Sequence, residues 1–111
     1  MPLLSITTSE RVDDKGLFLR NCSHLISQLT KKSEQYVMIR LFDQIPMYFN
    51  VDLSPSCFID FKSIGFLNPS EMSKEISTFI SNQIGIPSHR VYICFEDIKA
   101  SNWSWNGKTF G

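Results

Sequence analysis

Hydrophobic and polar positions along this chain predict two β-α-β units in succession. Four segments are rich in β-branched and aromatic side chains, which predicts strands at residues 2–8, 34–42, 57–65 and 90–97. Between the members of each pair, within residues 11–33 and 68–90, apolar residues recur at spacings of three and four, which predicts amphipathic helices. Residues 43–56 hold two prolines and several turn formers and predict a loop or an irregular hairpin.

The first helix has one apolar stripe and charged residues at its ends. Asp13 or Asp14 can cap its N-terminus, where a carboxylate also interacts favourably with the helix dipole. Lys31 and Lys32 fall at the C-terminal end, where cations are favoured, and Lys32 taken by itself is a solvated lysine. The stripe consists of Phe18, Cys22, Leu25, Ile26 and Leu29.

The second helix has the clearest start and stop signals in the chain. Asn68 is placed as the N-cap, Pro69 follows in the first turn, and Glu71 completes a capping pattern. Gly85 and Pro87 end the helix. Its apolar stripe consists of Met72, Ile76, Phe79, Ile80 and Ile84.

The order of elements predicts an α+β fold in one domain, residues 1–111. Two strands joined by a helix run parallel with a right-handed crossover, so two such units side by side form a four-stranded mixed sheet with both helices on one face. Residues 100–111 add a short strand and an Asn-Gly turn. No third layer remains to cover the other face of the sheet, so we expect that face to meet other subunits.

Composition narrows the function classes. Lysine and arginine number 11 and aspartate and glutamate number 11, so no excess of charge favours nucleic acid or an anionic membrane as a partner. Three widely spaced cysteines predict reduced, buried thiols, and two isolated histidines predict solvent-facing side chains, so we expect no metal and no cofactor. The chain has neither an apolar run of spanning length nor a signal-peptide pattern. We therefore expect a cytoplasmic protein, with export by a non-classical route left open.

Pro2 directly follows the first methionine. Proline is tolerated as the first residue of a strand, because its missing N–H need not leave a ladder hydrogen bond unmade. A methionine followed by a residue as small as proline is normally removed, and Pro2 would then carry the α-amine as a secondary amine. Pro2 is therefore a candidate functional residue as well as a strand start.

Two fold families satisfy the repeated β-α-β pattern. A ferredoxin-like fold is the first, but the chain has no basic patch, no paired solvent-facing aromatics and no cysteine cluster of the kind that its RNA-binding or metal-binding members use. The second is the tautomerase fold, in which two β-α-β units place both helices on one side. The absence of RNA-binding and metal-binding features favours the second.

Short motifs in matching order support the second fold. The chain carries, in order, "MP" at the start, "QYVMI" after Lys32, "SIG" at 63–65, "RVYI" at 90–93 and "NWSWNGKTF" at 102–110. With these motifs it resembles the macrophage migration inhibitory factor and D-dopachrome tautomerase family over its full length. The resemblance implies a homotrimer with active sites between subunits. It also implies keto-enol tautomerase activity on phenylpyruvate-like α-keto acids, or, as the alternative, a cytokine-like protein-binding role with vestigial activity.

The resemblance also implies roles for individual residues. Pro2 matches the catalytic amino-terminal proline, Lys32 the lysine that binds the substrate carboxylate or keto oxygen, and Ile64 the residue whose backbone N–H does the same. Tyr92 matches a tyrosine contributed by a neighbouring subunit. The aromatic walls of the substrate pocket are matched by Tyr36, Trp105 and Phe110.

The implied chemistry is physically coherent. One group with a pKa near the working pH can remove a proton next to a carbonyl and return it elsewhere. Burial and the Lys32 cation would both lower the pKa of the Pro2 amine toward neutrality. Cys94 stands where mammalian members carry asparagine in the substrate-binding site, which weighs against dopachrome as a substrate because a thiol is a weak donor. The C-x-x-C of the mammalian cytokine is replaced by residues 56–59, so we expect no thiol oxidoreductase activity.

Overall fold

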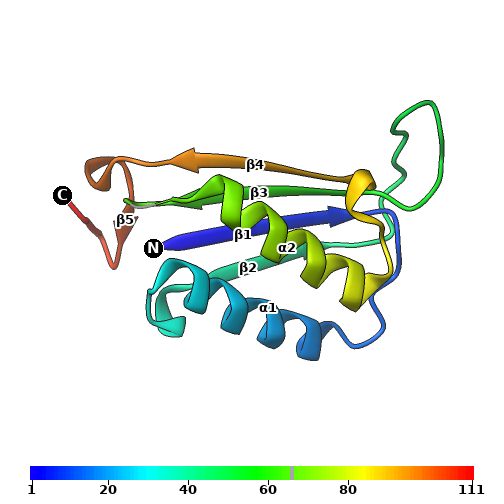
Figure 1. The fold of residues 1–111 in the computed structure, drawn as a ribbon. Helices are drawn as coiled ribbons and strands as arrows, with labels where there is room; N and C mark the ends of the chain where they lie inside the picture. Colours follow the sequence, from blue (N-terminus) through cyan, green and yellow to red (C-terminus); the bar gives the residue numbers. More distant parts are fainter. Residues whose placement is uncertain (66) are drawn as a thin grey trace.

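The protein is a four-stranded sheet covered on one face by two helices (Figure 1). The structure, a computed structural model, describes residues 1–65 and 67–111. The strand order is β2-β1-β3-β4. The elements of the two units are β1 (Pro2–Thr8), α1 (Lys15–Thr30), β2 (Met38–Phe42), β3 (Cys57–Ser63), α2 (Pro69–Ile84) and β4 (Val91–Asp97).

The sheet is mixed, as the sequence predicts. β1 runs parallel to β2 and β3 runs parallel to β4, so each unit is a parallel pair joined by its helix. The two units meet where β1 and β3 pair antiparallel, with Pro2 opposite Ser63 and Thr8 opposite Cys57. This arrangement confirms the predicted α+β fold of two β-α-β units.

Alternation along the central strands separates a buried face from an open face. In β1 and β3 every second side chain is buried beneath the helices, which fills the core with Leu4, Ile6, Ile59 and Phe61. The helices contribute the core residues Phe18, Cys22, Ile26, Met72, Ile76 and Ile80. The face away from the helices exposes Met38, Phe42, Phe58 and Tyr92. Such a group of exposed apolar side chains on one sheet face is unusual for a surface that meets only water.

The helix ends follow the predicted capping residues. The Asp14 carboxylate accepts a hydrogen bond of 3.0 Å from the backbone N–H of Leu17, and the Asn68 side chain accepts one from Glu71. Gly85 ends α2 with a φ of 80°, a conformation that glycine adopts without steric cost. At the end of α1, Lys31 takes the left-handed conformation instead.

Two predicted strands start later than the sequence indicated. Residues 34–36 form a single 3-10 turn, in which Tyr36 N donates to Ser33 O and Val37 N donates to Glu34 O, so β2 begins only at Met38. Ser88–Arg90 forms a similar turn before β4. β3 ends at Ser63 rather than at residue 65, because Gly65 has a φ of 88° and leaves the extended conformation.

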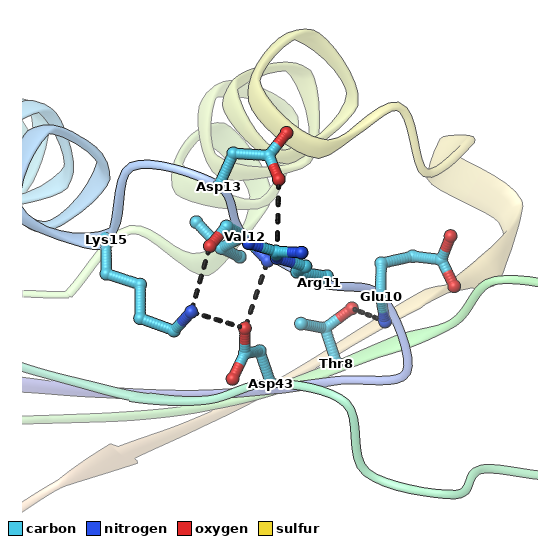
Figure 2. Close-up of polar contacts among 7 residues, drawn as sticks. All are labelled: Thr8, Glu10, Arg11, Val12, Asp13, Lys15 and Asp43. Carbon is cyan, nitrogen blue, oxygen red and sulfur yellow. Dashed lines mark hydrogen bonds and ion pairs between the residues drawn. The ribbon is translucent and has the colours of Figure 1, made fainter.

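Asp43 ties the connection between β1 and α1 to the end of β2 (Figure 2). Its carboxylate accepts a hydrogen bond of 3.0 Å from the backbone N–H of Val12 and forms an ion pair of 3.1 Å with Lys15. The Lys15 ammonium also donates to the carbonyl oxygen of Val12. The hydrogen bond from Val12, followed by that from Lys15, lowers the pKa of Asp43 below its ordinary value.

Arg90 forms hydrogen bonds with the backbone of the loop between β2 and β3. Its side chain is buried and its guanidinium lies 5.2 Å from the centre of the Phe49 ring. Within the loop Phe49 and Asp52 form an isolated bridge around the turn at Asn50 and Val51, which fits the predicted irregular hairpin. The guanidinium donates to the carbonyl oxygens of Phe49, Asp52, Ser54 and Pro55 and to the Oγ of Ser56.

The C-terminal segment forms a small hairpin, β5 (Ser104–Trp105) and β6 (Lys108–Thr109). Asn106 and Gly107, with φ values of 52° and 78°, make the turn that the Asn-Gly pair predicts. In Figure 1 this hairpin lies at the end of the sheet where the chain begins. It therefore brings residues near 105 next to the first strand.

Candidate active site

A cavity of about 560 Å³ opens between the start of β1 and the C-terminal hairpin. Its walls come from four parts of the chain: the N-terminus, the turn before β2, β3, and the segment 98–110. The described residues that line it are Met1, Pro2, Leu3, Gln35, Tyr36, Val37, Met38, Lys62, Ile98, Asn102, Trp103, Ser104, Trp105 and Phe110. The volume lies within the range of small-molecule sites, roughly 300–1,000 Å³.

Pro2 lies where the first strand meets this cavity. Its side chain is almost completely buried, and in the ladder it is opposite Ser63 of β3. Met1 precedes it and carries the α-amine against the cavity wall. Desolvation, and after it the positive charge of Lys32, lowers the pKa of this amine below its ordinary value of 8.0.

Aromatic side chains form the wall that faces the start of β1. The rings of Tyr36 and Trp105 meet edge to face, with centroids 6.4 Å apart and planes at 85°. Tyr36 is available because the 3-10 turn of residues 34–36 replaces the predicted start of a strand. The backbone N–H of Phe110 donates to the carbonyl oxygen of Trp103, which ties the chain after the hairpin to the segment before it.

Lys62 is a cavity residue that the sequence analysis missed. It is half-buried, lies on the open face of β3, and is opposite Leu3 of β1, which lines the same cavity. The alternation of β3 was a usable signal, because it separates Lys62 from the buried neighbours Phe61 and Ser63. The spacing alone could not show that this end of β3 borders a cavity.

Four of the eight predicted site residues line the cavity: Pro2, Tyr36, Trp105 and Phe110. Lys32 is exposed outside the lining, although its charge acts on the N-terminal amine. Ile64 follows directly after β3 and is half-buried. Pro2 therefore lies in one cavity with the predicted aromatic residues. The predicted polar contacts, Lys32 and the backbone of Ile64, lie outside the described lining of that cavity.

Tyr92 and Cys94 lie far from Pro2 within one chain. Ser63, the partner of Pro2, is opposite Asp97 on β4, and Tyr92 is five residues earlier along that strand. At a rise near 3.3 Å per residue, this separates Tyr92 from the level of Pro2 by roughly 16 Å. Tyr92 packs instead against Phe49, with ring centroids 4.6 Å apart, and Cys94 is exposed on the open face rather than buried.

Among the described residues no group of three histidine, cysteine or acidic side chains is close enough to hold a metal ion. No helix in this part of the chain is long and apolar enough to cross a membrane. His24 and His89 are exposed, as predicted, and His24 forms a contact of 2.9 Å with Glu34.

Comparison with known proteins identifies the family. The family described as macrophage migration inhibitory factor (MIF) matches residues 1–111, the whole chain. The chain belongs to the MIF family. A homologue from Brugia malayi is 30% identical over 115 residues and is aligned over 100% of both chains. MIF-family proteins fall within the tautomerase superfamily, so the chain is related to isomerases.

Solved MIF structures share the fold closely. The MIF homologue from Prochlorococcus marinus superposes with a TM-score of 0.94 at 39% identity, over 98% of this chain and 99% of that one. The MIF of Trichinella spiralis superposes with a TM-score of 0.90 at 26% identity, over 97% and 99% of the two chains. The arrangement of two β-α-β units is therefore that of known MIF structures.

Proposed function

We propose that this MIF-family protein is a keto-enol tautomerase for phenylpyruvate-like α-keto acids, with the amine of Pro2 as its general base. The observation that carries the proposal is the position of Pro2, buried at the start of β1 and lining the cavity. Removal of Met1 makes the Pro2 nitrogen a secondary amine at the cavity wall. The proposal requires that amine to be neutral near physiological pH.

The surroundings of the amine favour its neutral form. The amine of Met1, one residue earlier, already has its pKa lowered by desolvation and by Lys32. The Pro2 ring is buried, so its nitrogen would also lie in a partly desolvated position. A neutral amine with a lowered pKa can take a proton from a carbon acid and hand it back within one turnover.

In the proposed reaction one proton moves between carbon and oxygen. The Pro2 nitrogen takes a proton from the carbon next to the keto group, and the C–H electron pair becomes the double bond of the enolate. Lys32 and the backbone N–H of Ile64 stabilise the oxygen on which negative charge develops, and Lys32 also binds the carboxylate. The same proton then passes from Pro2 to that oxygen, which completes the enol without any other reactant.

The aromatic wall suits a substrate with a phenyl ring. Tyr36, Trp103, Trp105 and Phe110 border the cavity and would contact such a ring by burial and edge or face packing. The 560 Å³ of space accommodates an aromatic acid of about twelve heavy atoms, the size of phenylpyruvate, together with some water. These features support phenylpyruvate over a small aliphatic keto acid.

The proposal includes a homotrimer. Tyr92 cannot reach Pro2 of its own chain, and the open sheet face exposes Met38, Phe42, Phe58 and Tyr92 together. A neighbouring copy that covers this face would bury those side chains and bring its own Tyr92 to the cavity. Size-exclusion chromatography with light scattering should give three times the chain mass of 12.8 kDa.

The test is turnover of phenylpyruvate by protein of verified mass. Intact-mass measurement first establishes that Met1 is absent, and the enol absorbance then follows the reaction. Adding one alanine between Met1 and Pro2 converts the Pro2 amine into an amide and leaves its ring in place. We expect that variant, and Pro2→Gly, to lose about 10²-fold or more of the rate, in the range that general bases contribute.

Pro46→Gly is the matched control, because it alters a proline in the loop after β2 outside the cavity. It should keep the parental rate. Circular dichroism and light scattering show whether each variant keeps its fold and assembly. Equal rates for the parent and the alanine-extended variant would end the proposal that Pro2 is the base.

A further inference from the structure

We propose that Lys62 binds a second carboxylate of the substrate, so that the cavity takes aromatic α-keto acids with two acidic groups. The inference rests on the proposed function, because it names the substrate class of the same site. Lys62 is the one charged side chain among the described residues that line the cavity.

The wall is positively charged although the chain as a whole is neutral. The described lining residues contain no aspartate or glutamate, and their charged side chain is the Lys62 ammonium. Lys32 adds a second positive charge close enough to lower the pKa of the amine. A cavity with cations and no acidic side chain is complementary to anions.

Lys62 has no acidic partner within ion-pair distance in the described part of the chain. The ion pairs found there join Arg11 to Asp13, Lys15 to Asp43 and His24 to Glu34. On β4 the residue opposite Lys62 is Glu96, which is exposed and makes no ion pair with it. A half-buried ammonium beside apolar walls gains more from a carboxylate than a fully solvated one does, because less water screens the pair.

Lys62 and Lys32 flank the start of β1 from opposite sides. β1 lies between β2 and β3 in the sheet, with Lys32 in the segment that leads into β2 and Lys62 on β3. A substrate whose keto acid end is held by Lys32 next to Pro2 leaves Lys62 free for a group farther along the molecule. The aromatic residues of the cavity wall would contact the ring that joins the two carboxylates.

This arrangement also bears on Cys94. The resemblance assigns this position to substrate binding, and in this chain it holds a thiol, which donates only weakly. Lys62 supplies a strong donor and a full positive charge from a different strand. The structure therefore offers a distal contact of a different kind, selective for an acid rather than for a neutral polar group.

The kinetic test compares phenylpyruvate with its ring-carboxylated form, 4-carboxyphenylpyruvate, on Met1-free protein. We expect the parent to prefer the dianion in kcat/KM, and Lys62→Met to reduce that preference at least tenfold, mainly by raising KM for the dianion. Lys62→Arg should keep the preference. Lys74→Met removes an exposed lysine on α2 and should leave the preference within twofold of the parent.

A binding test separates this inference from the proposed function. Both tryptophans of the chain line the cavity, so their fluorescence can report binding of the unreactive acids cinnamate and 4-carboxycinnamate. The parent should bind the dianion at least fivefold more tightly, Lys62→Met should bind the two alike, and Glu96→Gln should strengthen dianion binding.

The two ideas fail in different ways. If the parent turns over neither keto acid but still prefers 4-carboxycinnamate through Lys62, the proposed catalysis is wrong and the anion site stands. If phenylpyruvate is turned over and Lys62→Met changes both substrates and both acids equally, or neither, the dianion site is overturned.

Discussion

The guanidinium of Arg90 donates a hydrogen bond of 2.8 Å to the Oγ of Ser56, and both side chains are buried. The same guanidinium donates to backbone carbonyl oxygens along residues 49–55. One side chain therefore donates hydrogen bonds to several loop carbonyl groups that lie outside the strands and helices. The loop between β2 and β3 owes its shape to a residue near the start of β4.

Replacing Arg90 by alanine should destabilise the fold. The change takes the Arg90 donor from the carbonyl oxygens of Phe49 and Pro55 and from the buried Ser56 Oγ, so we expect a loss of about 2–4 kcal/mol in the free energy of unfolding. Urea unfolding followed by circular dichroism measures it. Arg20→Ala, at an exposed position of α1, is the control and should stay within about 0.5 kcal/mol of the parent. Similar urea midpoints for the two variants would show that the loop between β2 and β3 keeps its structure without Arg90.

Asp43 should make stability depend on acid pH. Its pKa in the folded chain is lowered from 3.8 by the hydrogen bonds from Val12 and Lys15, so the folded state prefers the ionised carboxylate. The resulting stabilisation is present above the unfolded pKa and is lost as the pH falls through the lower folded value. In urea titrations between pH 6 and pH 3, Asp43→Asn should be less stable than the parent at pH 6, and the gap should narrow toward pH 3. A constant gap over this range would contradict the role of the charge.

Cys22 and Cys57 should resist alkylation in the folded protein. Burial raises the pKa of each thiol to about 12, so almost no thiolate forms at pH 8 and little reagent reaches it. Iodoacetamide followed by peptide mass spectrometry should label both only after unfolding in urea, and unfolded protein is the positive control. Labelling of either residue at the same rate before and after unfolding would show that the core opens readily.

Lys32 should set the position of the pH profile in the proposed reaction. Its positive charge disfavours the protonated amine, so Lys32→Met should raise the pKa of the Pro2 amine and move the acid limb of kcat/KM to higher pH. Lys31→Met removes the neighbouring charge at the end of α1 and should leave the limb in place. Carboxylate binding by Lys32 also affects the height of the kcat/KM profile. The comparison therefore uses the pH at which the acid limb falls, and not the height. If the acid limbs of the two variants coincide, Lys32 does not control the pKa of the Pro2 amine.

Local sequence signals were enough to predict most of the fold. Asn68, Pro69 and Gly85 act within a few residues of themselves, and α2 begins and ends where they indicate. Residues 34–36 misled the prediction, because their aromatic and polar mixture suits a strand while the hydrogen bonds of a 3-10 turn form instead. The turn depends on the chain leaving α1 and entering β2, which a strand pattern does not encode.

The candidate site was less predictable, because it depends on which segments meet. Tyr36 and Trp105 are far apart in sequence and come together only when the C-terminal hairpin folds back beside β1. Alternation places Lys62 on a face of β3, but only the antiparallel pairing of β1 with β3 brings it next to Leu3 and the cavity. Tyr92 shows a different limit, since the resemblance assigned it to the cavity of a neighbouring subunit, and in its own chain it lies at the end of β4 away from Pro2.

The buried start of β1 governs how the protein can be handled in the laboratory. Any affinity tag or protease remnant ahead of Pro2 would continue from Met1, whose side chain already lines the cavity. Such an extension would occupy part of the cavity and convert the amine into an amide. Gly111 is exposed at the other end of the chain, so a fusion partner there leaves the first strand unchanged. Chains tagged at the N-terminus and at the C-terminus are, in chemical terms, two different reagents.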